Sequence, residues 1–150
     1  MQVAFSPDVL VYVCTNCIPR QGSLPRQWNQ DSARVLVREV PCSGKTDGQY
    51  LCHAIEGGAR GVCVVACPKG DCHLSQGNYR AEVRVGTLKR LLGEIGLEPE
   101  RAELVHVSPD GPPEQLDNLV RAAVARICAL GESPLHAHGG EQTTAGKPAR

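Results

Sequence analysis

The chain has few aromatic side chains and no net charge. Only 3% of its 150 residues are aromatic, with one Trp and one Phe. Proteins that stack nucleic-acid bases need several exposed aromatic rings, so base stacking is not expected here. The 16 basic and 16 acidic residues cancel, and no overall field attracts the chain to nucleic acid or to an anionic membrane. We therefore expect no nucleic-acid partner.

The amino terminus also lacks the features of a targeting segment. Residues 1–8 show no basic cluster followed by a long apolar stretch, so we expect neither a secretory signal nor a membrane span. The expected location is the cytoplasm, without direct insertion into a membrane. Cellular thiols keep disulfides reduced there, so the eight cysteines do not predict a disulfide framework. Metal or redox chemistry is the better interpretation of these cysteines.

What the sequence does contain is an alternation of short β-branched runs and helical patterns. Strands are predicted for the apolar runs at 9–13, 35–40, 62–66 and 104–107. Helices are predicted at about 46–55, at 77–95 and from Pro113 onward, and Gly96 and Gly131 stand where the last two should end. Strands that alternate with helices form right-handed crossovers. The predicted fold is therefore α/β: a small doubly wound, mainly parallel four-stranded sheet with flanking helices.

The two later helices are predicted to be amphipathic. In the helix over 77–95, apolar side chains form one broad stripe that consists of Tyr79, Val83, Leu88, Leu91, Leu92 and Ile95. The last helix has an apolar face that runs from Leu116 to Ile127. Both patterns are typical of helices that cover a sheet.

Two segments do not follow this alternation. Residues 18–31 contain Pro19, Gly22 and few apolar side chains, so we expect a long loop with at most a short helix. Residues 134–150 contain a single large apolar side chain, Leu135, and we expect a disordered tail. The predicted organisation is one α/β domain over residues 1–133 and a tail over residues 134–150.

Five of the eight cysteines follow the carboxyl ends of predicted strands. They are Cys14, Cys17, Cys42, Cys67 and Cys72. The carboxyl ends of parallel strands share one edge of a sheet, and open α/β sheets bind their ligands at that edge. We therefore expect these five thiols to converge on one pocket. The other three, Cys52, Cys63 and Cys128, fall within predicted elements and are expected to be small core residues.

The spacing of Cys14 and Cys17 occurs in zinc sites, iron–sulfur sites and dithiol redox motifs. The chain has an apolar core of its own, so zinc is less needed for folding than in small zinc-dependent domains. Four thiolates around an iron–sulfur cluster suit loops at strand ends, where backbone N–H groups offset the negative charge of the cluster. Five thiols for four positions leave one over, and the sequence does not identify it. His73, which follows Cys72, is a minor alternative ligand.

Three segments resemble the signature of one family. They are residues 41–44 (PCSG), 66–73 (ACPKGDCH) and 77–84 (GNYRAEVR). They resemble the iron–sulfur delta subunit of methyl-viologen-reducing hydrogenases, which is associated with heterodisulfide reductase, and the resemblance extends from about the first strand to Gly131.

This resemblance implies a 2Fe–2S cluster whose ligand pool is Cys14, Cys17, Cys42, Cys67 and Cys72. It also implies an electron-transfer subunit with two partners. One is a hydrogenase or other dehydrogenase module, and the other is a flavin-containing heterodisulfide-reductase-type subunit. The chain would be part of an oxidoreductase complex and would have no catalytic activity alone.

Two other functions stay open on the residues themselves. One is a zinc-stabilised interaction module, and the other is a thiol–disulfide oxidoreductase that uses Cys14 and Cys17. No nucleophile with a paired base and no carboxylate pair accompany the cysteine loops, so substrate chemistry is not expected. The iron, sulfide and zinc contents of the purified protein separate these functions.

Overall fold

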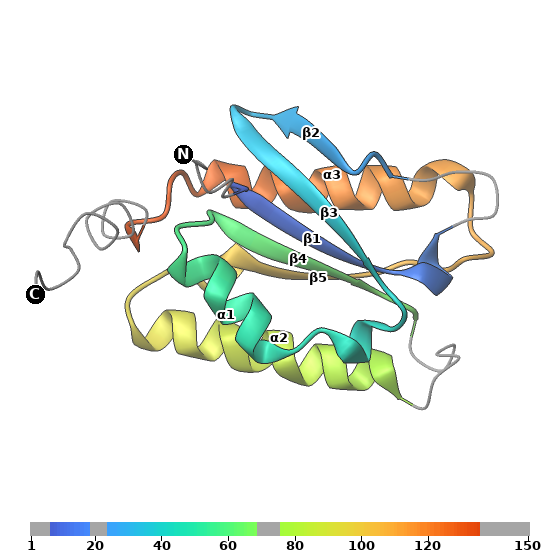
Figure 1. The fold of residues 1–150 in the computed structure, drawn as a ribbon, viewed down its shortest axis with the longest axis horizontal. Coiled ribbons are helices and arrows are strands. Elements are labelled where there is room, and N and C mark those ends of the chain that lie inside the picture. The colour runs from blue at the N-terminus through green and yellow to red at the C-terminus, as the bar shows by residue number, and fades with distance from the viewer. Residues whose placement is uncertain (1–6, 19–23, 69–75, 136–150) are drawn as a thin grey trace, which may run out of the picture.

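The computed structural model describes residues 7–18, 24–68 and 76–135. In these residues, five strands form one sheet in the order β2-β3-β1-β4-β5 (Figure 1). The strands are β1 (Val9–Cys14), β2 (Gln27–Gln30), β3 (Ala33–Val40), β4 (Gly61–Ala66) and β5 (Ala102–His106). The helices are α1 (Gly48–Glu56), α2 (Gly77–Glu94) and α3 (Pro113–Ala129), with short 3-10 turns η1 (Thr15–Cys17), η2 (Ser43–Lys45) and η3 (Pro99–Arg101).

Strand β1 lies at the centre of the sheet and pairs in parallel with both β3 and β4, and β5 is parallel to β4. All six residues of β1 and all six of β4 are buried, as expected for parallel strands that are covered on both faces. The predicted α/β fold and its four parallel strands are confirmed.

The sheet has a fifth strand that the sequence did not predict. Strand β2 lies within residues 18–31, where a loop was expected, and pairs antiparallel with β3. Asp31 and Ser32, with φ angles of 49° and 63°, form the two-residue turn between them, and this left-handed backbone suits a tight hairpin. Trp28 of β2 packs against the core on the α3 face, and the Arg121 guanidinium of α3 lies 4.8 Å from its ring centroid.

Helix α3 covers one face of the sheet, and α1 and α2 cover the other (Figure 1). On the α3 face, Val9, Val11 and Val13 pack with Val120 and Val124. On the opposite face, the core side chains are Leu10, Tyr12, Leu51, Ile55, Val62, Val64, Ala81, Val85, Leu88 and Leu92. Alternate residues of β1 thus serve the two cores.

Helix α2 buries a different face from the predicted stripe. Its buried apolar side chains are Ala81, Val85, Leu88 and Leu92. From the predicted stripe, Leu88 and Leu92 are buried, but Tyr79, Val83, Leu91 and Ile95 are between 40% and 68% exposed. The prediction was wrong for these four residues because apolar side chains occur on both sides of α2, and their spacing alone does not identify the side that meets the sheet.

The carboxyl-terminal end of the described chain stays on the core. Ser133 is buried, its Oγ accepts a hydrogen bond from the Leu135 N–H at 3.2 Å, and Leu135 packs against the α1–α2 face. Residues 136–150, which make up the rest of the predicted tail, lie outside the described residues. In the part of the chain that is described, no helix is both long and apolar enough to cross a membrane.

Candidate metal centre

Three of the predicted cysteines meet where β1 and β4 end. Cys14 is the last residue of β1, Cys17 ends the η1 turn that follows, and Cys67 comes directly after β4. Because Val13 is opposite Val65 in the parallel β1–β4 pair, the two strands end side by side at the same edge of the sheet. The connection after β1 leads to β2 and β3 on one side of β1, and the connection after β3 crosses to β4 on the other side. The cysteines therefore lie at the topological switch point, where open α/β sheets bind ligands.

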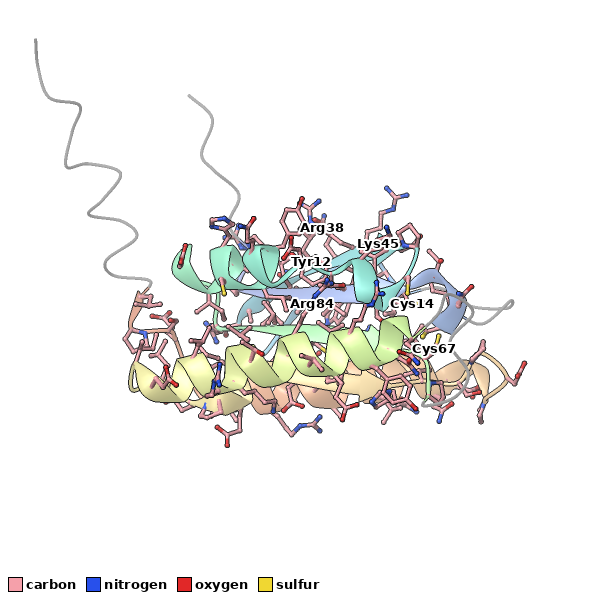
Figure 2. The ribbon with its side chains drawn as sticks, turned by 90° about the horizontal axis from the view of Figure 1, so that it is seen from below. Tyr12, Cys14, Arg38, Lys45, Cys67 and Arg84 are labelled. Atoms are coloured by element: carbon pink, nitrogen blue, oxygen red, sulfur yellow. The ribbon has the colours of Figure 1, made fainter. Side chains whose placement is uncertain are left out.

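The three sulfur atoms form one compact group. The Sγ of Cys67 lies 3.9 Å from that of Cys14 and 3.6 Å from that of Cys17, and all three sulfurs are within 4.8 Å of one another. Each residue is at most 1% exposed, and Figure 2 shows Cys14 and Cys67 together at one end of the sheet. Thiolates bound to one tetrahedral metal ion at about 2.3 Å are roughly 3.8 Å apart. The observed spacing therefore fits ligands of a shared soft metal centre.

The thiols of Cys14 and Cys17 have pKa values shifted in opposite directions. A hydrogen bond from the Cys17 thiol lowers the pKa of Cys14 to about 5, against the opposing effect of burial, and backbone N–H groups of Asn16 and Ser43 add to the shift. The same hydrogen bond, together with burial, raises the pKa of Cys17 far above its usual range. The lowered pKa favours the thiolate form of Cys14, and the thiolate is the form that binds metals.

Cys42 lies beside this group without joining it. It follows β3 by two residues, and its Sγ accepts a hydrogen bond from the Gly44 N–H at 3.4 Å. Its loop contacts the group through Pro41, whose carbonyl oxygen is 4.0 Å from the Cys14 sulfur. The described ligand atoms that all lie within 4.8 Å of one another are the sulfurs of Cys14, Cys17 and Cys67, and the Cys42 sulfur is not among them. Cys72 and the alternative ligand His73 lie outside the described residues.

The amino-terminal turns of α2 hold the Cys67 loop in place. The buried Asn78 side chain donates through Nδ2 to the carbonyl oxygens of Pro68, at 2.7 Å, and of Cys67, at 3.3 Å. His106, at the end of β5, places its Nδ1 2.9 Å from the same Cys67 oxygen. The sequence analysis did not identify Asn78 or His106 as supporting residues. The only signal for Asn78 was its place in the GNY segment of the family resemblance.

The same helix holds the Cys42 loop. Arg84 donates through Nη1 to the carbonyl oxygens of Gly44 and Thr46, and the η2 turn packs closely against the start of α2. A Cβ atom on Gly44 would lie 2.7 Å from the Cα of Gly77. Gly44 is therefore required by a close approach of two backbones, and α2 fixes the positions of both cysteine loops.

This contact predicts the effect of Gly44→Ala. We expect the variant to lower the free energy of unfolding by ~1–3 kcal/mol, since the Cβ must displace backbone rather than a flexible side chain. Because the displaced loop carries Cys42, a metal bound at the thiol group should also be released faster to a chelator. Gly48→Ala is the matched control, since nothing lies within 4 Å of a Cβ at Gly48. Urea unfolding and the rate of metal release measure both effects, and equal rates for the two variants would contradict this role of Gly44.

Comparisons with known proteins agree with this geometry. The iron–sulfur subunit of an F420-non-reducing hydrogenase from Archaeoglobus profundus is 35% identical over 109 residues, which is 72% of this chain and 80% of the relative. The iron–sulfur subunit of the same kind of hydrogenase from Methanocaldococcus jannaschii is 36% identical over 108 residues, with the same two coverages of 72% and 80%.

A third relative is much longer than this chain. It is one of the subunits of the ferredoxin:CoB-CoM heterodisulfide reductase of Methanosarcina mazei, and it is 32% identical over 126 residues, which is 83% of this chain but only 16% of the relative. The sequence model of one family, described as the delta subunit of methyl-viologen-reducing hydrogenase, matches residues 9–131. That match includes every strand and helix described above and all three converging cysteines. The chain therefore belongs to the methyl-viologen-reducing hydrogenase delta subunit family, as its sequence motifs predicted.

Proposed function

We propose that this chain is the iron–sulfur subunit of a hydrogenase associated with heterodisulfide reductase, and that it transfers electrons between the two. The observation that carries the proposal is the group of three buried thiols at 3.6 Å and 3.9 Å. Soft thiolate ligands at this spacing select iron, copper(I) or zinc over hard cations. The names of the relatives, which are iron–sulfur subunits of hydrogenases, favour iron among these metals.

The group that we propose is a 2Fe–2S cluster held by Cys14, Cys17 and Cys67, with the fourth ligand from Cys42 or Cys72. Such a cluster takes up and releases one electron at a time. The chain surrounds the thiols with hydrogen-bond donors: backbone N–H groups of Asn16 and Ser43 point to the Cys14 sulfur, and that of Gly44 points to Cys42. Donors to cluster sulfurs raise the reduction potential. In this proposal, the protein tunes the potential mainly through backbone groups of the cysteine loops.

The proposed electron acceptor or donor on one side is a flavin-containing heterodisulfide-reductase-type subunit, called the reductase-type subunit below. In the Methanosarcina mazei relative, the region similar to this chain occupies 16% of a heterodisulfide reductase polypeptide. There, the homologous region and the rest of the reductase polypeptide are covalently joined. This arrangement favours a polypeptide of the same type as partner of the separate chain. The hydrogenase or another dehydrogenase module is the proposed partner on the other side, and the proposed location is the cytoplasm.

Metal analysis of the anaerobically purified chain tests this proposal. We expect about two iron and two sulfide per chain, and an electron paramagnetic resonance signal of a single unpaired electron after reduction by dithionite. The reduced chain should pass its electron to a redox partner, and it should not turn over a metabolite. One zinc per chain without iron would support the zinc-stabilised module instead. A metal-free chain that reduces disulfides catalytically would support the oxidoreductase that uses Cys14 and Cys17.

A further inference from the structure

The outer face of α2 exposes apolar side chains that the fold does not use. Tyr79 and Val83 are 43% and 68% exposed and lie one turn apart. Gly86 follows at the next turn, and a Cβ at that position would meet nothing within 4 Å. These three residues lie at i, i+4 and i+7, so they share one side of the helix, away from the buried Ala81 and Val85.

Gly86 has no packing role among the described residues. It lies in the middle of an 18-residue helix, and glycine is a poor helix former. Where glycine on a helix surface is not explained by its own chain, it permits the close approach of a second backbone. Together with Tyr79 and Val83, it forms a surface that fits another helix.

Two adjoining clefts connect this surface to the metal centre. A cleft of about 340 Å³ is lined by Gln76, Tyr79, Arg80, Val83 and Arg84. The neighbouring cleft of about 450 Å³ shares Arg80 and Arg84 and extends to Lys45 and Cys42. Figure 2 shows Lys45 and Arg84 near the end of the sheet that carries Cys14 and Cys67. A partner seated on α2 therefore lies beside the cysteine loops.

The charge of these clefts is mainly positive. Lys45, Arg80 and Arg84 are the cationic side chains that line them, and among the described lining residues Asp47 is the acidic one. The Asp47 carboxylate already caps α1, where it accepts a hydrogen bond from the Gln49 N–H at 3.2 Å. This imbalance complements carboxylates on a partner and directs them to the thiol end of α2.

We propose that the α2 docking face, defined as Tyr79, Val83 and Gly86 with Lys45, Arg80 and Arg84, binds an amphipathic helix of the reductase-type redox partner. The apolar side of that helix packs on the three α2 residues, and its carboxylates meet the three cations. This inference rests on the proposed function and assigns the contact surface. A second copy of the chain fits less well, because a two-fold contact would place the cations of both copies together.

The test uses the full chain with its iron and the reductase-type subunit of the same host, purified together and separately without oxygen. Val83→Asp should raise the Kd for the reductase-type subunit by about tenfold or more, as expected for a central apolar contact. Tyr50→Asp is the matched control, since Tyr50 is 62% exposed and lies on α1. It should leave the Kd within about twofold, in the range typical of residues outside the energetic centre of an interface. Iron content should be unchanged in both variants.

A second variant separates docking from stability. Gly86→Leu should raise the thermal stability of the isolated chain, because leucine is the better helix former, and should still weaken binding by filling the space for the partner backbone. Arg80→Glu should weaken binding and reduce its dependence on salt.

The outcomes distinguish the docking face from the proposed function. If Val83→Asp and Gly86→Leu bind the reductase-type subunit as tightly as Tyr50→Asp does, the docking face is overturned and the proposed function stands. If the unmodified chain does not bind the reductase-type subunit, the proposed partnership itself fails, and the docking face fails with it. A dimer of the unmodified chain that Val83→Asp dissociates would assign this face to a second copy and overturn the proposal.

Discussion

Replacing Cys67 with serine should remove iron from a chain that stays folded. The Cys67 sulfur contacts both other sulfurs of the group, at 3.9 Å and 3.6 Å, so its loss leaves two converging ligands. The loop itself should keep its shape, because Asn78 and His106 contact the Cys67 carbonyl oxygen rather than its side chain. We expect the iron content to fall by about tenfold or more, since even residues that only support metal ligands change metal affinity by about 10–100-fold.

Cys63→Ser is the matched control for this experiment. Cys63 lies on the same strand, β4, and is completely buried, and burial raises the pKa of its thiol to about 12. It is a core residue on the α3 face, so its serine variant should keep its iron and lose ~1–2 kcal/mol of stability. Iron analysis and urea unfolding of both variants check the prediction. Full iron in Cys67→Ser, or loss of iron in folded Cys63→Ser, would show that the centre is elsewhere.

The same measurement on the remaining cysteines identifies the full ligand set. Cys14→Ser and Cys17→Ser should behave like Cys67→Ser, because their sulfurs belong to the same compact group. Of Cys42→Ser and Cys72→Ser, the variant that loses iron identifies the fourth ligand. The variant that keeps iron identifies the spare thiol.

The sequence predicted the edge of the sheet where the cysteines lie, because four β-branched runs and the helices between them define a parallel sheet. It did not predict which thiols meet there. Strand β1 separates β3 from β4, and neighbouring strands are about 4.8 Å apart. Cys42, which follows β3, therefore starts two strand spacings away from Cys67, which follows β4. Whether the Cys42 thiol reaches the other three thiols depends on the shape of the loop after β3. The pattern of predicted strands contains no information about the shape of that loop.

Two other features depend on contacts between distant segments. The outer face of α2 was assigned to the core because Val83 is as apolar as Val85, and only the packed sheet distinguishes them. Strand β2 was missed because Trp28 is its only large apolar residue. The hairpin turn at Asp31 and Ser32 and the contact of Trp28 with Arg121 hold it in place. Local propensity is weak in both cases, and tertiary packing decides the structure.

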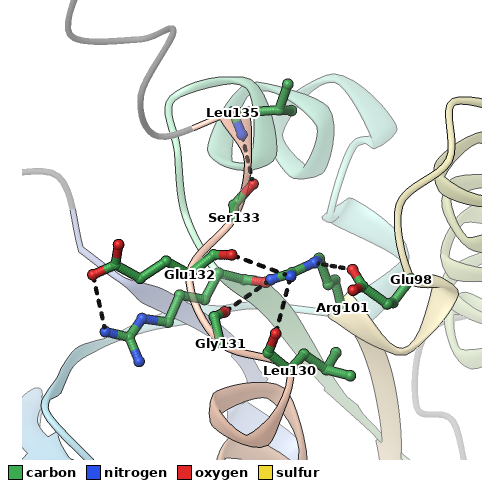
Figure 3. Close-up of polar contacts among 8 residues, drawn as sticks. Glu98, Arg101, Leu130, Gly131, Glu132, Ser133 and Leu135 are labelled. Atoms are coloured by element: carbon green, nitrogen blue, oxygen red, sulfur yellow. Dashed lines mark hydrogen bonds and ion pairs between the residues drawn. The ribbon is translucent and has the colours of Figure 1, made fainter.

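Arg101 gives the second large effect, because its charged side chain is buried at the end of the sheet away from the cysteines. Arg101 is 1% exposed and lies just before β5. As Figure 3 shows, its guanidinium contacts Glu98 at 2.7 Å and donates to the carbonyl oxygens of Leu130, Gly131 and Glu132 at 3.1–3.4 Å. It also donates to the Arg60 carbonyl oxygen at 2.9 Å. One side chain thus satisfies backbone oxygens from the end of α3 and from the chain before β4.

Replacing Arg101 with methionine should therefore lower the free energy of unfolding by ~2–4 kcal/mol. Methionine fills a similar volume but leaves these carbonyl oxygens without a donor, and each buried unsatisfied group costs ~1–3 kcal/mol unless water reaches it. It also removes the positive charge that stabilises the carboxyl-terminal end of α3.

Arg126→Met is the control, since Arg126 has an ion pair with Glu103 at 3.1 Å but a side chain that is 55% exposed. An exposed pair of this kind contributes less than about 1 kcal/mol. Urea unfolding at neutral pH measures both variants.

Iron per folded chain should be unchanged in Arg101→Met, because the thiols lie at the opposite ends of the strands. If the two variants unfold at the same urea concentration, the buried contacts of Arg101 add nothing beyond an exposed ion pair. If Arg101→Met remains stable but loses iron, the two ends of the sheet are coupled in a way that the packing does not predict.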